Sequence, residues 1–473
     1  MTPSKHLILF TLGPVQSFIA QARKTQDLYA GSKLLSDLIK VAIHKVGEAN
    51  LIFPALGAAM PNRFLAYVPD NITDFQQFGN DVEIAVRTEW SKIADETLER
   101  VNVNKPLGFD EQIDNHLEIF WVIQEKGNDY ATALATMEKQ LAAIKNVRPF
   151  RQLNYNGMIG EKGRKCSLDG QRNALFYRER TMDDGSKTKP PYVSIKAEPI
   201  TKPEINEGEG LSAISFVKRF YSSSGFDSTA DIALKYTLEQ IQNEPMLKTC
   251  IALIQKANSQ LFYEDNVKDD VLKKYLREAN INEQSAKSYK DCSDNIRAAV
   301  KAKGLSMQKY YAILTFDGDD MGKWLSGKWL AEGENLEDFH KQFANQLAEF
   351  AIEAKEEVDA VGRTVYAGGD DFLGFVNLYH LLPVLKRLRG LFREKVNDPL
   401  AEFRNEKEIS FTAGICIAHY KEPLSLVLDA ARDAQDKAKD LDYKNAFGIT
   451  VIKGSGESHT AVAPFGNGEE NLD

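Results

Sequence analysis

The alternation of apolar and polar positions divides the last third of the chain into strands and helices. Residues 310–316 form a continuous apolar stretch, which predicts a buried strand. Two shorter apolar runs, 364–367 and 372–376, lie on either side of a glycine-rich turn and predict a hairpin. Further strands are expected at about 409–418 and 448–452. Apolar residues at helical spacing predict helices from about Leu336 to Val358, Leu378 to Lys395 and Leu424 to Leu441.

This order of elements is strand, helix, hairpin, helix and strand, followed by an additional helix and strand. It predicts a ferredoxin-like sheet with additions, which is the palm of nucleotide cyclases and many polymerases. The fold class expected for the whole chain is α+β, with two ferredoxin-like palm domains and a mostly helical insert between them.

The turn of the predicted hairpin is Gly368-Gly369-Asp370-Asp371. Its glycines allow backbone angles that other residues avoid, and they let a ligand approach closely. Two adjacent carboxylates repel each other unless a cation lies between them. Mg²⁺ (or Mn²⁺) is the obvious cation, because Mg²⁺ takes one or two carboxylates together with substrate phosphates. The turn therefore predicts a metal-nucleotide site and nucleotidyl transfer.

A second acidic cluster, Asp317-Gly318-Asp319-Asp320, directly follows the strand predicted at 310–316. A carboxylate at the end of that strand can share a pair of metal ions with carboxylates on a neighbouring hairpin. The backbone N–H groups of Gly318 and Gly322 can bind triphosphate oxygens. Asp320 is favourable near a helix dipole, whereas Asp319 is expected to be solvated or capping rather than a ligand.

Two lysines follow the last predicted helix, Lys439 near its end and Lys444 just beyond it. Such cations can neutralise phosphate charge as point donors.

Each of the three motifs also has a simpler interpretation. The glycine-aspartate turn could be a solvated turn, and the Asp317 cluster could be a loop or a helix N-cap. The lysines could be solvated side chains. Their joint occurrence in palm order favours a metal-nucleotide site.

Beyond these motifs, the chain resembles the large polymerase/cyclase-like subunit of type III-B (Cmr) CRISPR effector complexes. The resemblance covers nearly all of the chain and is carried by several further segments as well. They are Leu12-Gly13-Pro14-Val15-Gln16-Ser17-Phe18-Ile19, Ala22-Arg23-Lys24-Thr25, Leu28-Tyr29-Ala30-Gly31-Ser32, Pro61-Asn62-Arg63-Phe64-Leu65-Ala66 and 226–233. The second palm also resembles diguanylate cyclases more distantly.

The resemblance implies an activity and a set of site residues. In the family, pairing of a target RNA with the guide RNA switches on the palm, which joins ATP molecules into cyclic oligoadenylates for antiviral defence. Metal binding is carried over to Asp317, Asp370 and Asp371, with Gly318 nearby. Nucleotide contacts are expected at Gly318, Asp320, Gly368, Gly369, Lys439 and Lys444. The implied partners are guide RNA, target RNA, other Cmr subunits and ATP.

Three departures from the family limit this expectation. The chain starts almost directly at the first palm, and none of its seven histidines is followed by aspartate, so an N-terminal His-Asp nuclease domain is not expected. The frame 163–170 has Asp169 where relatives carry a second zinc-binding cysteine, and Cys250, Cys292 and Cys416 are isolated in the sequence. Bound zinc is therefore not expected. The chain also stops soon after the last palm strand, as a natural short form or a trimmed one.

Composition is consistent with a globular protein of two to four domains. The chain has 473 residues, of which 43% are hydrophobic and 27% charged. No apolar run reaches the roughly 18 residues of a membrane span, and no signal peptide is evident. Four scattered cysteines suit a reducing cytoplasm. The net charge of −9 argues against a broadly basic nucleic-acid binder, but not against local RNA contacts within a complex.

The expected organisation contains a weak internal duplication. The strand at 7–12, Gly13-Pro14 and a helix from Val15 to Lys24 parallel the strand, Asp317 loop and following segment of the second half. Gly13-Pro14 cannot assemble the same metal pair, so the first palm is expected to supply a second nucleotide's pocket, with Ser32 and Lys33 as candidate contacts. A helix cap is an equal explanation for Ser32. The expected parts are 1–148 (first palm), 149–210 (irregular module), 211–305 (helical domain), 306–455 (second palm) and 456–473 (tail).

Some alternatives stay open at this point. The same site could couple ATP to S-adenosylmethionine, or the chain could be a catalytically silent scaffold of the RNA-guided complex. Phe216, Phe220 and Tyr221 are expected to pack under a helix rather than stack on a base. Arg148, Arg151, Arg164 and Lys165 are candidates for RNA contact, with a solvated loop as the other explanation.

Overall fold

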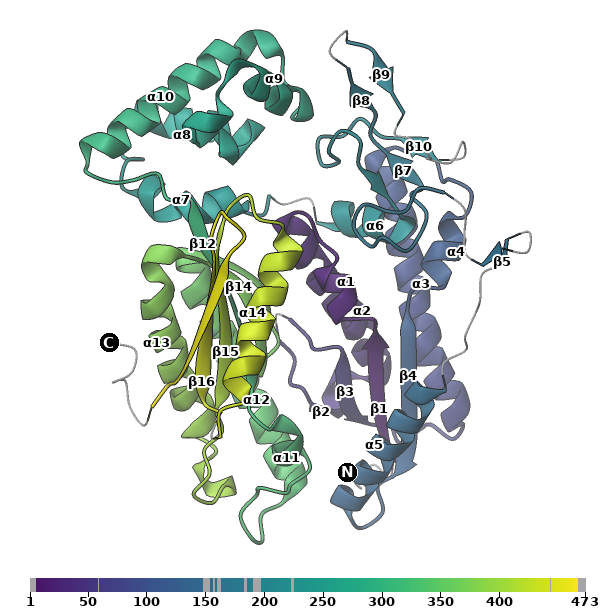
Figure 1. The fold of residues 1–473 in the computed structure, drawn as a ribbon. Coiled ribbons are helices and arrows are strands. Elements are labelled where there is room, and N and C mark those ends of the chain that lie inside the picture. The colour runs from purple at the N-terminus through teal and green to yellow at the C-terminus, as the bar shows by residue number, and fades with distance from the viewer. Residues whose placement is uncertain are drawn as a thin grey trace.

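The fold consists of two mixed helix–sheet domains side by side, with smaller modules covering one end (Figure 1). The computed structural model describes residues 6–57, 59–147, 154–155, 158–159, 163–182, 185–189, 197–222, 225–442 and 444–466. Among these residues, no helix is long and apolar enough to span a bilayer. The candidate RNA contacts Arg148 and Arg151 lie outside the described residues.

The first palm contains a four-stranded sheet in the order β2-β3-β1-β4. Its central strand β1 alternates between two cores: Ile8 and Phe10 face α2 and α3, whereas Leu7 and Leu9 face α5. The elements in chain order are β1 (His6–Gly13), α1 (Gln16–Ala20), α2 (Thr25–Val46), β2 (Leu51–Phe53), β3 (Arg63–Tyr67), α3 (Phe75–Val101), α4 (Phe109–Asp114), β4 (Glu118–Glu125) and α5 (Tyr130–Asn146).

The helix expected from Val15 to Lys24 is wrong in its extent. Only the short α1 forms there, and the long α2 begins at Thr25. The carboxylate of Asp27 accepts hydrogen bonds from the backbone N–H groups of Arg23 and Lys24, both at 3.0 Å. These bonds satisfy N–H groups at the start of α2, so a new helix begins where the pattern suggested the end of one.

The second palm contains a six-stranded sheet in the order β13-β14-β12-β15-β16-β17. The buried strand, hairpin and helices predicted for this half are present, each within a few residues of its expected bounds. The elements are β12 (Tyr310–Gly318), α11 (Met321–Leu325), α12 (Leu336–Val361), β13 (Gly362–Ala367), β14 (Asp371–Asn377), α13 (Leu381–Phe392), β15 (Phe411–His419), α14 (Leu424–Lys439), β16 (Ala446–Ile452) and β17 (Ser458–Pro464).

The second palm extends further than expected at its C-terminal end. Residues from 456 onward were expected to be a tail, but β17 pairs with β16 in antiparallel fashion from Ser458 to Pro464. Gly456 adopts a φ of +84° in the turn between the two strands, which glycine allows without strain. The side chains of β17 are mostly exposed, and therefore no apolar pattern marked it as a strand.

The two sheets share one topology. The strand order β2-β3-β1-β4 of the first palm corresponds to β13-β14-β12-β15 of the second. Gly13 pairs with Glu118 and Asp317 pairs with Thr412, and α5 follows Glu118 at the same chain spacing at which α14 follows Thr412. Gly13 is therefore the counterpart of Asp317, and Lys145 near the end of α5 is the counterpart of Lys439. The duplication expected from the layout is present.

The palms pack against each other reciprocally. Helix α2 of the first palm contacts β13 of the second, and α12 of the second contacts β2 of the first. Since α2 corresponds to α12 and β2 to β13, the same pair of surfaces meets twice, as in a two-fold symmetric dimer.

Two smaller parts lie over one end of the palms (Figure 1). An irregular module contains the three-stranded sheet β10-β7-β11 and two separate two-stranded pairs, β5-β6 and β8-β9. The strands are β5 (Asn154–Tyr155), β6 (Met158–Ile159), β7 (Phe176–Tyr177), β8 (Arg180–Thr181), β9 (Lys187–Thr188), β10 (Glu198–Pro199) and β11 (Gly210–Leu211). The helices that follow are α6 (Ala213–Tyr221), α7 (Thr229–Glu239), α8 (Pro245–Ala257), α9 (Asp269–Glu278) and α10 (Ala286–Ala302).

Several side chains considered from the sequence have internal roles here. Phe216 and Phe220 are buried, and the Phe216 ring stacks on Phe176 with centroids 4.0 Å apart, so the expected packing role is confirmed. Asp169 accepts a 2.8 Å hydrogen bond from Ser212 Oγ. Cys250 of α8 and Cys292 of α10 form a disulfide bond across 42 residues of sequence. The two cysteines are far apart in the sequence, as expected, but the fold joins them, which differs from the reduced cysteines that the scattered positions suggested.

Candidate active site

Three carboxylates meet at one end of the second palm sheet. Asp317, near the end of β12, pairs in register with Asp371, the first residue of β14. Asp370 lies in the turn just before β14. Gly369 in this turn has a φ of +103°, and a Cβ atom there would lie 3.0 Å from the Cβ of Leu347 on α12. Glycine is thus required both for the turn conformation and for the close approach of α12.

Gly318 does not offer its N–H group to a ligand. That N–H donates a 2.8 Å hydrogen bond to the carbonyl oxygen of Asp370, which fixes the turn to the end of β12. A Cβ atom at Gly318 would lie 2.4 Å from Cε of Met321. The proposed phosphate contact through the Gly318 N–H is therefore wrong, because this group is already used within the sheet.

The charges of the three carboxylates act on one another. Burial and the nearby charge of Asp317 raise the pKa of Asp370. Burial and the charges of Asp370 and Asp317 raise the pKa of Asp371. The ionised forms of both carboxylates are thus disfavoured, and a nearby cation would stabilise them.

Lys439 supplies one such cation. Its Nζ contacts Oδ2 of Asp317 in an ion pair whose side chains are 28% and 44% exposed. The sequence placed Lys439 near the site as a phosphate ligand, and the structure brings it to a carboxylate instead. A metal ion bound to Asp317 would compete with this amine for the carboxylate.

Lys444 and Asp320 form an ion pair with each other and do not line the cavity between the palms. Lys444 Nζ lies 2.8 Å from Asp320 Oδ1, and Lys323 Nζ lies 2.9 Å from the same oxygen. Burial acts to raise the pKa of Asp320, but hydrogen bonds from the two lysines outweigh it and lower the pKa below its usual range. Neither Asp320 nor Lys444 is among the residues that line the cavity between the palms.

Asp319 is neither solvated nor a helix cap. It is buried, and it accepts hydrogen bonds from Ser410 Oγ and Thr412 Oγ1, both at 2.7 Å, and from the N–H of Asn445 at 3.0 Å. Burial raises its pKa, although these hydrogen bonds oppose the shift. The hydrogen bonds of Asp319 connect the end of β12 with β15 and with the loop before β16. This structural role is not evident from the sequence, where Asp319 lies within a run of acidic residues.

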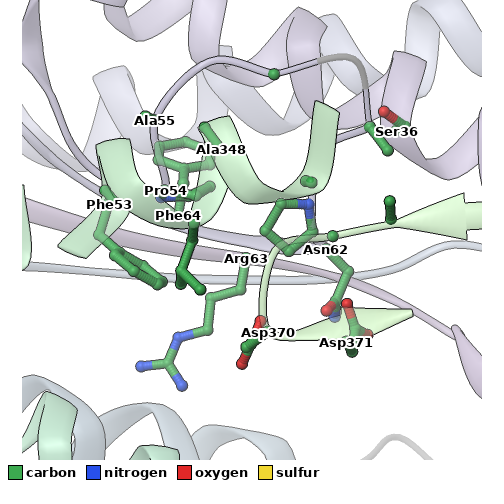
Figure 2. A pocket seen from close by; sticks show the side chains of 18 of the residues that line it. Ser36, Phe53, Pro54, Ala55, Asn62, Arg63, Phe64, Ala348, Asp370 and Asp371 are labelled. Carbon is green, nitrogen blue, oxygen red and sulfur yellow. The ribbon is translucent and has the colours of Figure 1, made fainter. Parts of the chain in front are cut away.

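A cavity of about 740 Å³ lies between the two palms and contains the three carboxylates in its wall. Figure 2 shows Asp370 and Asp371 in this wall together with Asn62 and Arg63 of the first palm. Its size falls within the range of about 300–1,000 Å³ typical of small-molecule sites. Ser32 and Lys33, the two first-palm residues expected near a second nucleotide, both line it. Lys33 forms an ion pair with Asp37 within α2.

Several lining residues were not identified from the sequence. Arg63 of β3 forms an ion pair with Glu138 of α5. Phe53, Leu134 and His340 line an apolar part of the cavity. Arg63 belongs to a segment that carried the family resemblance, but nothing in that segment marks a site residue, because its meaning depends on the second palm lying opposite.

Hydrogen bonds and ion pairs join the palms beside the cavity. Glu337 of α12 accepts a hydrogen bond from the Tyr67 hydroxyl and lies 2.6 Å from Lys126 Nζ, both in the first palm. Burial acts to raise the pKa of Glu337, but its partners, including Lys341, lower the pKa to about 2. The Tyr130 hydroxyl lies 2.8 Å from Nδ1 of His340, and burial lowers the pKa of that histidine to about 4. The wall of the cavity is thus fixed from both domains.

Among the described residues, no group of three or more His, Cys, Asp or Glu side chains forms a ready-made metal cage. The donor chemistry still fits a hard divalent cation, since Asp370 and Asp371 have raised pKa values and Asp317 already pairs with a cation. Binding such an ion requires that Lys439 and the carboxylates rearrange.

Two family models match the chain in the two palm halves. The model described as Cas10/Cmr2, second palm domain, matches residues 310–448, and the model described as CRISPR-associated protein Cmr2, N-terminal, matches residues 7–95. The CRISPR system Cmr subunit Cmr2 of Pyrococcus furiosus is 26% identical, and the match covers 96% of this chain and 62% of that protein. The chain thus spans less than two thirds of the length of this relative.

Solved structures with the same fold come from type III-B Cmr-beta complexes. A chain of the complex bound to cognate target RNA matches with a TM-score of 0.61 at 14% identity, over 98% of this chain and 71% of that one. A chain of the apo state matches with a TM-score of 0.66 at 14% identity, over 98% and 70%. These matches confirm the α+β fold with two palms, and together with the family models they confirm the resemblance identified from the sequence.

Proposed function

We propose that this chain, which carries the second palm domain of the Cas10/Cmr2 family, is a metal-dependent nucleotidyltransferase that joins ATP molecules into a cyclic oligoadenylate. One observation carries the proposal: Asp317, Asp370 and Asp371 line a cavity of about 740 Å³ between two palms. A single carboxylate cluster facing a second nucleotide-sized surface suits the transfer of one nucleotide to another.

Asp317, Asp370 and Asp371 would hold two Mg²⁺ (or Mn²⁺) ions. Bound there, the ions would neutralise phosphate charge and lower the pKa of the attacking hydroxyl. The donor set favours this role, because burial and mutual repulsion already raise the pKa values of Asp370 and Asp371. A cation in contact with them relieves that repulsion.

In the proposed reaction, the ribose 3′-hydroxyl of one ATP attacks the α-phosphate of another. A phosphorus–oxygen bond to the ribose forms, the bond to the β-phosphate oxygen breaks, and pyrophosphate leaves with the electron pair. The hydroxyl proton passes to solvent, since no side chain in the described part of the chain is positioned as an evident base. Phosphoryl transfer of this kind depends mainly on positioning and electrostatics.

Lys439 would exchange its partner during this reaction. Its amine forms an ion pair with Asp317. With nucleotide bound, the amine would turn to a phosphate oxygen and leave the carboxylate to the metal. The first palm would hold the second ATP, with Ser32 and Lys33 on α2 as contacts, since both line the same cavity.

We further propose that the chain works within a type III-B complex with guide RNA, target RNA and other Cmr subunits. The Cmr-beta chain with the same fold was solved in a complex bound to cognate target RNA, which supports this assembly. Synthesis would be switched on by the matching target RNA.

Mass spectrometry of products tests the activity. The chain, assembled with guide-loaded Cmr subunits, is incubated with ATP, S-adenosylmethionine and Mg²⁺, with and without matching RNA. We expect RNA-dependent cyclic oligoadenylates, and a loss of about 10³-fold or more in the D370A/D371A variant. The matched control is D433A/D436A, which removes two exposed carboxylates of α14 in the same palm and should keep the activity.

Other outcomes would redirect the proposal. An adenylated methionine derivative would keep the site and change the acceptor. Normal turnover by D370A/D371A would remove the assignment of the carboxylates. No product from the assembled wild-type complex under any of these conditions would favour a silent scaffold.

A further inference from the structure

The three carboxylates of the second palm have no acidic counterpart at the corresponding strand ends of the first palm, although Asp37 and Glu138 of the first palm also line the cavity. The counterpart of Asp317 in the first palm is Gly13, and the register of β1 and β3 brings Pro61 beside it: Thr11 pairs with Arg63, and the N–H of Leu12 donates to the carbonyl of Asn62. Neither Gly13 nor Pro61 can ligate a metal through its side chain. A metal ion is therefore not held at these two positions, and side-chain cations are another means of neutralising phosphates on this side.

Arg63 is the cation closest to this position in the chain, two residues after Pro61. It starts strand β3 and lines the cavity (Figure 2). Figure 2 shows its side chain starting near Asp370, with the guanidinium extending to the side away from Asp371. An arginine in the cavity wall offers a planar fork of donors, which matches phosphate oxygens better than a lysine amine does.

The present partner of Arg63 can be displaced. Its guanidinium forms an ion pair with Glu138, and the two side chains are 41% and 44% exposed. Ion pairs with this exposure contribute little free energy, so a ligand with several negative charges competes well. Glu138 lines the cavity too, which means that a ligand can reach between the two groups.

Lys33 is a weaker candidate for the same role. Its partner Asp37 lies one turn away on the same helix and also accepts a 2.6 Å hydrogen bond from the Tyr221 hydroxyl. Lys33 is therefore held along α2, whereas Arg63 and Glu138 come from different elements and can separate without disturbing a helix.

We infer that Arg63 binds the phosphates of the nucleotide held by the first palm, in place of a metal ion, and that Glu138 competes with those phosphates for the guanidinium. This inference rests on the proposed function and deepens it by assigning the two halves of the cavity different means of neutralising phosphate. The second palm uses carboxylate-bound metal; the first uses a guanidinium.

The test is binding of ATP in EDTA, where no divalent metal is present. Calorimetric titration of the full chain should show metal-independent ATP binding that R63A weakens by about tenfold or more, because a charged hydrogen-bonding partner is lost. R63K should fall between the two, since it keeps the charge but loses the fork. E138Q should bind ATP a few-fold more tightly, because the competing carboxylate is gone.

Two controls keep the outcome interpretable. R387A removes an arginine that resembles Arg63 in exposure but lies outside the cavity. Arg387 is 47% exposed, and its Nε lies 3.0 Å from Oε1 of Glu357. The R387A variant should bind ATP as wild type does. The melting temperatures of R63A and wild type are compared as well. Equal values would show that a weaker ATP affinity of R63A does not come from a loss of stability when its ion pair with Glu138 is removed.

The result separates this inference from the proposed function. If R63A binds ATP in EDTA as wild type does, the inference is overturned, whatever the complex synthesises with Mg²⁺. If R63A loses metal-independent binding while the assembled wild-type complex makes no product, Arg63 stands as a phosphate-binding residue and the transferase proposal fails.

Discussion

The two palms of this chain have the same strand order and opposite chemistry at corresponding positions. Asp317 pairs with Asp371 across the central strands of the second palm, whereas Gly13 and Pro61 lie at the matching place in the first. Both central strands nevertheless alternate between two apolar cores. The sheet topology thus depends on the apolar alternation, and the acidic end of the strand can change without loss of the fold.

The difference also shows which features belong to the fold and which to the site. A lysine near the end of the last palm helix is present in both halves, as Lys145 and Lys439. Lys439 contacts a carboxylate, whereas Lys145 lies 3.4 Å from the hydroxyl of Thr11. Both palms thus have a lysine at this position. Its partner depends on the residues of the central strand, a carboxylate in the second palm and a hydroxyl in the first.

The largest expected effect separates these two lysines. We expect K439A to lower the activity of the assembled complex by about 10–100-fold, since a charged partner of the phosphate is lost, and K145A to lower it by less than about threefold. Initial rates of pyrophosphate release at saturating ATP measure the difference. Equal losses in the two variants would mean that the lysines of the two palms have the same role, and that the palms do not differ in chemistry at this position.

A smaller effect concerns Asp319, whose counterpart in the first palm is Val15. D319A removes the acceptor of three hydrogen bonds from a buried position and should lower the free energy of unfolding by about 2–4 kcal/mol. V15A, at a half-buried residue, should cost less than about 1 kcal/mol. Urea denaturation measures both. A D319A variant as stable as V15A would show that the hydrogen bonds of Asp319 do not stabilise the fold.

The smallest effect tests the contact between the palms. Glu337 has a pKa lowered to about 2, below the usual 4.3 or so of an unfolded glutamate. Its ion pairs therefore stabilise the fold above about pH 4.5, and this contribution is lost as the pH falls toward 2. E337Q should unfold with about 0.5–1 kcal/mol less free energy at pH 7, and the difference should shrink by about pH 3, which lies between the folded and unfolded pKa values.

E402Q, at an exposed glutamate of the same palm, is the control for this measurement and should stay within about 0.5 kcal/mol of wild type at both pH values. A difference between E337Q and wild type that does not change with pH would show that hydrogen bonding by a neutral side chain is enough at this position.

Most of the second palm could be predicted from the sequence. Its strands are continuous apolar runs and its helices have regular apolar spacing, so local pattern and tertiary structure agree from 310 to 452. The three carboxylates were predicted together for the same reason, since a strand end and an adjoining hairpin must meet in such a sheet.

Partners that depend on side-chain packing could not be predicted. Asp319 and Asp320 are neighbours in one acidic run, yet one is buried against β15 and the other pairs with Lys444 on the surface loop. The sequence does not distinguish them, because an aspartate can either accept hydrogen bonds in a buried position or form an ion pair with a surface lysine. Arg63 was missed for a related reason, as its surroundings are set by a domain more than 240 residues further along the chain.

The reciprocal packing of α2 on β13 and α12 on β2 has a consequence for how this site can change over time. In a homodimer, every substitution appears twice and must suit both halves of the interface. Here both halves lie on one polypeptide, so a residue in one half can differ from its counterpart in the other. The first palm has Pro61 at the position where the second has Asp371. Covalent linkage thus removes the constraint of symmetry and lets two like surfaces take different roles.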